Sequence, residues 1–193
     1  MNAQTSKVYQ KNIAALELLF PGIEKQLQSI AGTEEALSFE TARDGRVTVK
    51  RKGIYLHSKF APIKEAEKLI QQIDFSQHEG VIFFGFGLGY YLEAYLSQSD
   101  SLENPKPIII LEPSAQRFLQ SLEARPLDHL FQESSLYLLI GTEAQTIANL
   151  LGQLPRGTRF QAVKLRPLYD QVKEEFRPFE EKIHNYLQRE EVN

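Results

Sequence analysis

The sequence predicts an α/β fold, in which a mostly parallel sheet is flanked by helices and preceded by an N-terminal helical segment and a small β-hairpin. Four short apolar runs are separated by segments of helical periodicity. The first three runs, at residues 81–84, 108–111 and 136–140, lack the alternation of a half-exposed strand, as is typical of a parallel sheet covered on both faces. The first run leads directly into a glycine-rich turn and then a helix, so the expected architecture is Rossmann-like.

The N-terminal residues 1–57 are expected to extend a main domain that is placed at residues 58–193. Apolar residues at alternating steps of four and three predict helices over residues 9–30, interrupted by a Pro-Gly pair. Two alternating stretches then flank Asp44 and Gly45, which predicts a hairpin. A third short strand is expected to follow it, at residues 54–56.

The main domain is expected to continue the alternation of helices and strands to its end. The last segment, residues 172–187, has helical spacing with a kink or restart at Pro178. The two amphipathic ends of the chain, residues 9–30 and 168–190, are a candidate surface for docking another domain or forming a homo-oligomer. The other predicted elements are helices at 62–73, 90–96, 115–122 and 143–151 and a fourth strand at 160–165.

Composition excludes several classes of protein. The 193 residues are 42% hydrophobic and 24% charged, with a formal net charge of -3, so the chain is expected to be globular and without a nucleic-acid partner. The basic run Lys50, Arg51 and Lys52 is interpreted as a solvated strand end. No apolar run approaches the roughly 20 residues of a membrane span, so no membrane partner is expected. Cysteine is absent, and a cytoplasmic location is the expectation.

No metal site is expected from the sequence. The four histidines, His57, His78, His129 and His184, do not have the close spacing of zinc ligands. Each is interpreted as an ordinary surface or boundary residue. Whether the protein uses a cofactor is left open, as is the identity of any ligand.

The glycine turn after the first strand is the main candidate site. Gly85, Gly87 and Gly89 stand where the first strand of a doubly wound sheet feeds a helix, whose N-terminal N–H groups attract anions. Glu112 ends the second strand, where a carboxylate can accept hydrogen bonds from ribose hydroxyls. Thr142, at the end of the third strand, is positioned to touch a base or sugar. These residues predict a ligand site at the carboxyl edge of the sheet.

The spacing of the glycines favours some classes of nucleotide ligand over others. The dinucleotide pattern G-x-G-x-x-G would have its third glycine at Tyr90, whose bulk disfavours that site, although its ring could stack on a base. The G-x-G-x-G form resembles the first motif of S-adenosylmethionine-dependent methyltransferases, with Glu112 as the ribose-binding acid. That family has an acid where this sequence has Phe83, and its amine-binding Asn-Pro-Pro-Tyr motif has no counterpart here.

A purely structural interpretation of the same residues stays open. Glycines at a tight turn between strand and helix avoid a steric cost whether or not a ligand binds. Glu112 can assist the start of the next helix, and Thr142 can be a helix N-cap. The chain would then be a non-enzymatic interaction module.

Three stretches together resemble the N-terminal region of the motility-associated-factor (Maf) proteins, which are bacterial glycosyltransferase-like proteins. The stretches are "GIYLHSKFAPIKEAEKLI", "GVIFFGFGLGYYLEAYL" and "IIILEPSAQRFLQSL". The matching positions are His57, Ser58, Pro62, Glu65, Ala66, Gly85, Gly87, Gly89, Tyr90, Glu112 and Pro113.

The resemblance implies a role in attaching nonulosonic acids to flagellin. In the family, this region precedes a larger domain that is thought to hold the transferase site, and the sequence ends about where that domain would begin. The implied function is therefore an accessory domain, not catalytic by itself, that binds a nucleotide-sugar or docks a downstream catalytic domain or flagellin. An S-adenosylmethionine-binding protein is the alternative.

Overall fold

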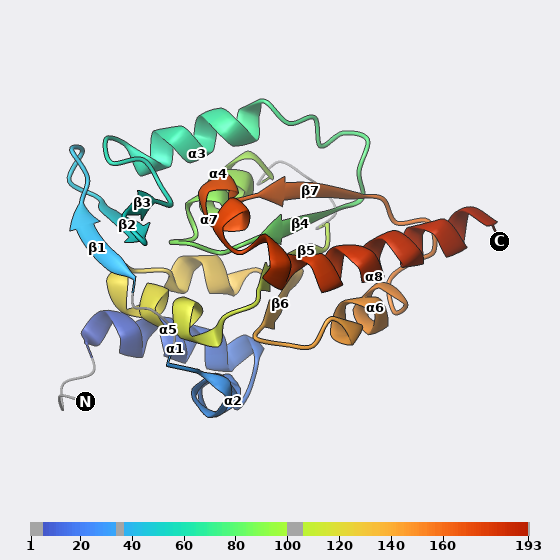
Figure 1. Ribbon diagram of the computed structural model, residues 1–193, viewed down its shortest axis with the longest axis horizontal. Helices are drawn as coiled ribbons and strands as arrows, with labels where there is room; N and C mark the ends of the chain where they lie inside the picture. Colours follow the sequence, from blue (N-terminus) through green and yellow to red (C-terminus); the bar gives the residue numbers. More distant parts are fainter. Residues whose placement is uncertain (1–5, 34–36, 100–105, 193) are drawn as a thin grey trace.

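The computed structural model describes residues 6–33, 37–99 and 106–192, and its main feature is a four-stranded parallel sheet (Figure 1). The strand order is β6-β5-β4-β7. In chain order this is 3-2-1-4, the order of half a Rossmann fold, so the predicted fold class is confirmed. The strands are β4 (Gly80–Phe84), β5 (Ile108–Glu112), β6 (Leu136–Ile140) and β7 (Phe160–Lys164).

The two central strands are buried along their whole length. Val81 of β4 pairs with Ile108 of β5, and the register continues to Phe84 and Leu111. Every residue of both strands is buried, because helices cover both faces of the sheet. This explains the continuous apolar runs in the sequence.

Helices pack around the sheet and on one another. Helix α3 packs on α4, α1 and α2 pack on α5, and α6 packs on α8. In Figure 1, α8 crosses in front of the sheet. The helices are α1 (Lys7–Leu19), α2 (Ile23–Ile30), α3 (Pro62–Gln71), α4 (Tyr90–Ser99), α5 (Ala115–Ala124), α6 (Gln145–Leu151), α7 (Arg166–Gln171) and α8 (Lys173–Val192), with a short 3₁₀ helix at Asp128–Gln132.

The N-terminal extension forms as predicted and shares the core of the main sheet. The helical stripe is split between α1 and α2 at Pro21–Gly22, where Gly22 has a φ of 83°. A three-stranded antiparallel sheet follows, with β1 (Ser38–Thr41), β2 (Val47–Arg51) and β3 (Ile54–Tyr55). Leu16, Leu27 and Val49 are fully buried in the same hydrophobic cluster as β4 and β5. The domain boundary at residue 57 stays a prediction.

The C-terminal helical segment differs from the prediction in where it breaks. The sequence predicts a kink or a restart at Pro178; α8 continues through this residue, which contradicts the restart, and the kink stays a prediction. The break lies at Val172, which caps α7 with a φ of -126° and a ψ of 32°. Val172 is nevertheless buried, and it lies four residues before the buried Phe176. Because this helical spacing continues across the break, the pattern of apolar residues does not show where the helix ends. Among the described helices, none has the length and apolar character needed to cross a membrane.

Candidate functional site

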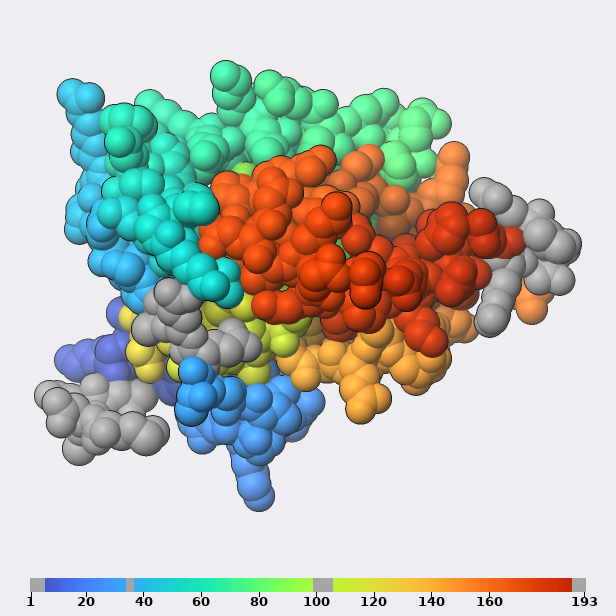
Figure 2. Space-filling model, in the orientation of Figure 1, coloured from blue at the N-terminus to red at the C-terminus, as the bar shows by residue number. Residues whose placement is uncertain are grey.

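The predicted site residues gather at the carboxyl edge of the parallel sheet. The turn of residues 85–89 joins β4 to α4, Glu112 is the last residue of β5, and Thr142 follows β6 closely. In Figure 1, β4 and β7 point toward the small sheet and α7. The space-filling view shows the segment around residues 50–60, in cyan, beside α7, in orange, and Arg51 Nη1 donates to Gln171 Oε1 across this contact at 3.2 Å (Figure 2). The edge is therefore covered by other parts of the chain.

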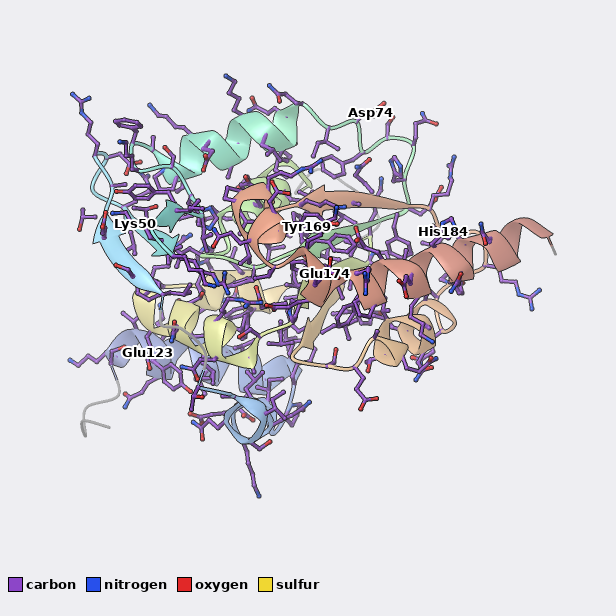
Figure 3. All side chains as sticks on the ribbon, viewed as in Figure 1. Lys50, Asp74, Glu123, Tyr169, Glu174 and His184 are labelled. Atoms are coloured by element: carbon purple, nitrogen blue, oxygen red, sulfur yellow. The ribbon has the colours of Figure 1, made fainter. Side chains whose placement is uncertain are left out.

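Helix α7 is fixed over the ends of β4 and β7 by polar contacts. The Tyr169 hydroxyl, labelled in Figure 3, lies 2.8 Å from both carboxylate oxygens of Glu180 on α8. Lys164, the last residue of β7, pairs with the same carboxylate at 2.6 Å. A Cβ added at Gly85 would meet the Leu168 side chain of α7 at 3.0 Å, so this helix packs directly on the glycine turn.

All three glycines of the turn have left-handed backbone angles. The φ values are 93° at Gly85, 56° at Gly87 and 74° at Gly89. Residues with a Cβ rarely adopt such angles, which is sufficient reason for glycine at each position. At Gly87 there is a second reason, because another side chain occupies the space where a Cβ would be.

That side chain is the imidazole of His57. A Cβ added at Gly87 would overlap His57 Nε2 and lie 2.6 Å from Leu165 Cδ2. The Leu88 N–H donates to His57 Nε2 at 2.9 Å. The sequence predicts that the second glycine lets a ligand approach the main chain; in the structure, the group that makes this approach belongs to the protein itself.

His57 corrects the interpretation of the histidines as surface or boundary residues. Its exposed fraction is 2%, and its ring packs edge-on against Tyr90 and Tyr91. Burial, reinforced by the charge of Arg125, lowers the pKa of His57 to about 3. Because Nε2 accepts a hydrogen bond from an N–H, the ring proton is on Nδ1, which has no partner among the described residues.

The buried His57 predicts loss of stability in mild acid. In the unfolded chain its pKa returns to 6.5, whereas the folded value is about 3, so between these pH values the unfolded state binds one more proton. Stability due to the neutral ring is therefore complete above pH 6.5 and falls by about 1.4 kcal/mol per pH unit below it. We expect a loss of about 2 kcal/mol between pH 6.5 and 4.5, measured by urea unfolding.

The matched controls are His57→Gln and His184→Gln, the latter on the exposed face of α8 (Figure 3). The His57→Gln variant should lose this pH dependence, and the His184→Gln variant should keep it. If the unfolding free energy fell equally with decreasing pH in the unmodified protein and in both variants, His57 would not be the group that causes the loss.

Glu112 is held in a buried ion pair with Arg117. The exposed fractions of these two side chains are 1% and 3%. Glu112 Oε1 accepts from Arg117 Nε at 3.0 Å and lies 2.9 Å from Arg117 Nη2. Arg117 Nη2 also pairs with Glu175 of α8 at 2.6 Å. The carboxylate predicted to bind ribose is thus engaged by the protein.

Backbone groups complete the surroundings of Glu112. The Phe86 N–H of the glycine turn donates to Oε2 at 3.2 Å, and the Ser114 N–H donates to Oε1 at the same distance. Ser114 in turn caps α5, since its Oγ accepts from the Arg117 N–H at 3.1 Å. Burial raises the pKa of Glu112, and Arg117 opposes this by lowering it. Glu112 therefore supports the start of α5, as the structural interpretation predicts.

Tyr90 and Thr142 lie on either side of this network. Tyr90 is 2% exposed; its hydroxyl donates to the Val47 carbonyl at 2.7 Å, and the Arg125 guanidinium stacks over its ring at 4.1 Å. Thr142 is half-buried, and α6 begins only at Gln145, so Thr142 is not its N-cap. The Thr142 Oγ1 has no partner among the described residues. Ligand binding by these residues, and by the glycines and Glu112, stays a prediction.

The His-Ser and Pro-x-x-Glu-Ala stretch builds the start of α3. Ser58 Oγ accepts hydrogen bonds from the N–H groups of Phe60 and Ala61. Glu65 reaches back from the first turn to accept from the Ser58 N–H at 2.8 Å, an arrangement that resembles a capping box. Pro62 occupies the first helical position. This motif fixes the segment that carries His57.

Among the described residues, two open pockets lie outside the glycine turn, and the first is lined in part by Leu130, which packs on Gly89. One, of about 330 Å³, lies between α4 and the 3₁₀ helix and contains the Glu93–His129 pair. The other, of about 260 Å³, lies along the edge strand β6 and is lined by Phe20, Leu138 and Leu150 among others. Within the described part of the chain, no group of three or more potential metal ligands occurs.

His57 and Arg117 are the two residues that sequence reasoning missed at the site. His57 belongs to the stretch that resembles the Maf proteins, but nothing in that stretch shows that its ring reaches the glycine turn, and Arg117 lies on a helix whose pattern shows only which face is apolar. For Arg117, the sequence does contain an indirect signal. A carboxylate that ends a buried strand needs a counter-charge, and Arg117 is the first basic residue after it.

Comparison with known proteins gives a family match and a relative. The model of the family described as the glycosyltransferase Maf N-terminal domain matches residues 55–171. An uncharacterized protein of Treponema pallidum (strain Nichols) is 32% identical over an alignment of 154 residues that covers 75% of this chain and 50% of that protein. The chain thus spans about half the length of this curated relative.

Solved structures support the fold. The Maf glycosyltransferase from Magnetospirillum magneticum AMB-1 matches 92% of this chain with a TM-score of 0.53 and 19% identity, over 35% of its own chain. MNMC2 from Aquifex aeolicus matches 72% of this chain and 53% of its own, at 19% identity and a TM-score of 0.37, which is too low to establish a common fold.

Proposed function

Because the chain belongs to the family of glycosyltransferase Maf N-terminal domains, we propose that it is an accessory domain of a glycosyltransferase, which assists transfer without catalysing it. The observation that carries this proposal is the closed carboxyl edge of the sheet. Gly87 is covered by His57, and Glu112 is neutralised by Arg117. A general base for sugar transfer must reach the acceptor hydroxyl. Neither the imidazole of His57 nor the carboxylate of Glu112 is free to do so.

The substrate class and location follow from the family resemblance. We propose a nonulosonic acid as the sugar, flagellin as the acceptor protein, and the cytoplasm as the location. Docking of a catalytic domain or of flagellin is the proposed contribution of this domain. Self-association through the terminal helices stays a prediction.

A transfer assay tests the accessory role. The chain is incubated with flagellin and a CMP-activated nonulosonic acid, and CMP release and the mass of flagellin are followed. We expect both to equal those of a sample without the chain, while flagellin binds the immobilised chain in biolayer interferometry. Transfer catalysed by the chain alone would contradict the accessory role, and the absence of flagellin binding would remove flagellin as the docking partner.

Nucleotide-sugar binding at the strand ends is the second proposal. It would involve Gly85, Gly87, Gly89, Tyr90, Glu112 and Thr142. Two polar groups at this edge favour it: among the described residues, nothing accepts a hydrogen bond from the Gly87 N–H, and Thr142 Oγ1 is also without a partner there. A buried polar group without a partner is uncommon and is often completed by a ligand or water.

A further inference from the structure

We infer that His57 is an internal occupant of the glycine turn, which fills the position of a nucleotide phosphate and keeps the turn closed until the segment carrying it moves away. This autoinhibitory contact rests on the proposed nucleotide-sugar binding and adds its regulation. It involves residues of the turn and of the link between β3 and α3, with Leu165 and Thr48 packed against them.

The position of the imidazole is that of a phosphate in a Rossmann turn. In such turns the N-terminal N–H groups of the first helix donate to the phosphate, and the second glycine leaves room for it. Here the Leu88 N–H, in the turn two residues before α4, donates to His57 Nε2 instead, at 2.9 Å. The space beside Gly87 is taken by the same ring and by Leu165. One neutral side chain thus replaces both the acceptor and the bulk of a phosphate.

The replacement is incomplete, which indicates that the turn can accept another group. His57 Nδ1 is buried and has no partner among the described residues. The Gly87 N–H likewise has no acceptor there. A phosphate has three oxygens to offer where the imidazole offers one nitrogen, so it could satisfy the Gly87 and Leu88 N–H groups together.

The segment that carries His57 is held by contacts that can be released locally. The His57 carbonyl accepts from Thr48 Oγ1 at 2.9 Å, and Glu65 accepts from the Ser58 N–H. Immediately beyond, the side chains of Lys59 and Phe60 are exposed, Phe60 to 55%, while their carbonyls accept from the Arg43 and Asp44 N–H groups at 3.0 Å each. Displacement of this link therefore breaks a small set of hydrogen bonds together with the contacts of His57, and we infer that a docked partner supplies the energy for it.

The test compares His57→Ala with the unmodified chain and with His184→Ala, which alters an exposed histidine on α8. CMP, inorganic phosphate and cytidine are titrated by calorimetry, so that phosphate and nucleoside contributions are separated. We expect CMP and phosphate to bind His57→Ala at least about tenfold more tightly than either of the other proteins, with cytidine unchanged. Equal affinities in the three folded proteins would overturn the inference.

A second readout applies if His57→Ala is unfolded in buffer. Phosphate should then restore its folded circular dichroism signal, compared with sodium chloride at the same ionic strength, and no recovery would overturn the inference. Imidazole should act in the same way, because it can re-enter the space of the lost ring. The titration and the transfer assay test different proposals. Equal affinities in the titration would contradict the closure of the turn by His57 but not the accessory role. Sugar transfer by the unmodified chain would contradict the accessory role but not the closure of the turn.

Discussion

The Arg117→Ala variant is expected to lose about 3–5 kcal/mol of unfolding free energy, because it leaves the carboxylate of Glu112 buried without its counter-charge. Both side chains are almost fully buried, so solvent cannot replace the lost partner. The alanine also leaves part of a fully packed position empty. Urea unfolding monitored by circular dichroism measures the loss at pH 7.

Two further variants separate the charge from the loss of volume. Adding Glu112→Gln to Arg117→Ala should restore part of the stability, because a neutral amide is less costly to bury than an unpaired carboxylate. Arg177→Ala, which removes a guanidinium that is 66% exposed, should cost less than about 1 kcal/mol. A double variant no more stable than Arg117→Ala would show that packing alone causes the loss.

The same variant should depend on pH in a defined direction. Burial already raises the pKa of Glu112, and removal of Arg117 takes away the main influence that lowers it. A carboxyl group whose pKa is higher in the folded state than in the unfolded state favours folding at low pH and opposes it as the pH rises. The stability deficit of Arg117→Ala should therefore shrink in acid.

The Gly87→Ala variant is the second change with a large expected effect, a loss of about 2–5 kcal/mol. A left-handed φ costs an alanine about 1–2 kcal/mol, and overpacking against His57 and Leu165 adds about 1–3 kcal/mol. Gly87→Asp, which carries more atoms into the same space, should be more damaging still. Thermal and urea unfolding measure both variants.

The matched control is Gly157→Ala. Gly157 has a φ of 75° but no heavy atom within 4 Å of an added Cβ, so it isolates the cost of the backbone angle. In addition, the cost of Gly87→Ala should fall in a His57→Ala background, because the nearest side chain is then absent. Equal costs at Gly87 and Gly157 would contradict a filled space beside Gly87.

The sequence predicts the fold well where one pattern determines one element. The buried strands at 81–84 and 108–111, the Asp44–Gly45 hairpin turn and the break at Pro21–Gly22 are all found where their residues indicate. The break at Val172 was missed, because a buried residue continued the apolar spacing across it. Local propensity cannot detect a break that tertiary packing imposes.

At the site, the sequence predicts positions but not their partners. It places the glycine turn and Glu112 at one edge of the sheet, which is confirmed, since Glu112 accepts from the Phe86 N–H of the turn. It also predicts a close approach to Gly87. The approaching group, His57, lies 31 residues before Leu88 and reaches it only through the packing of the small sheet. Contacts of this kind depend on the assembled fold and leave no periodic trace in the sequence.

The most direct test of the closed glycine turn is nitrogen-15 NMR of the His57 ring in the unmodified protein. If the imidazole is buried against Gly87, its signals should show a single neutral tautomer, with the proton on Nδ1, and should not titrate between pH 8 and pH 4.5, because the pKa of His57 is about 3. Titration near the ordinary value of 6.5, with both tautomers present at neutral pH, would place the ring in solvent and contradict the account.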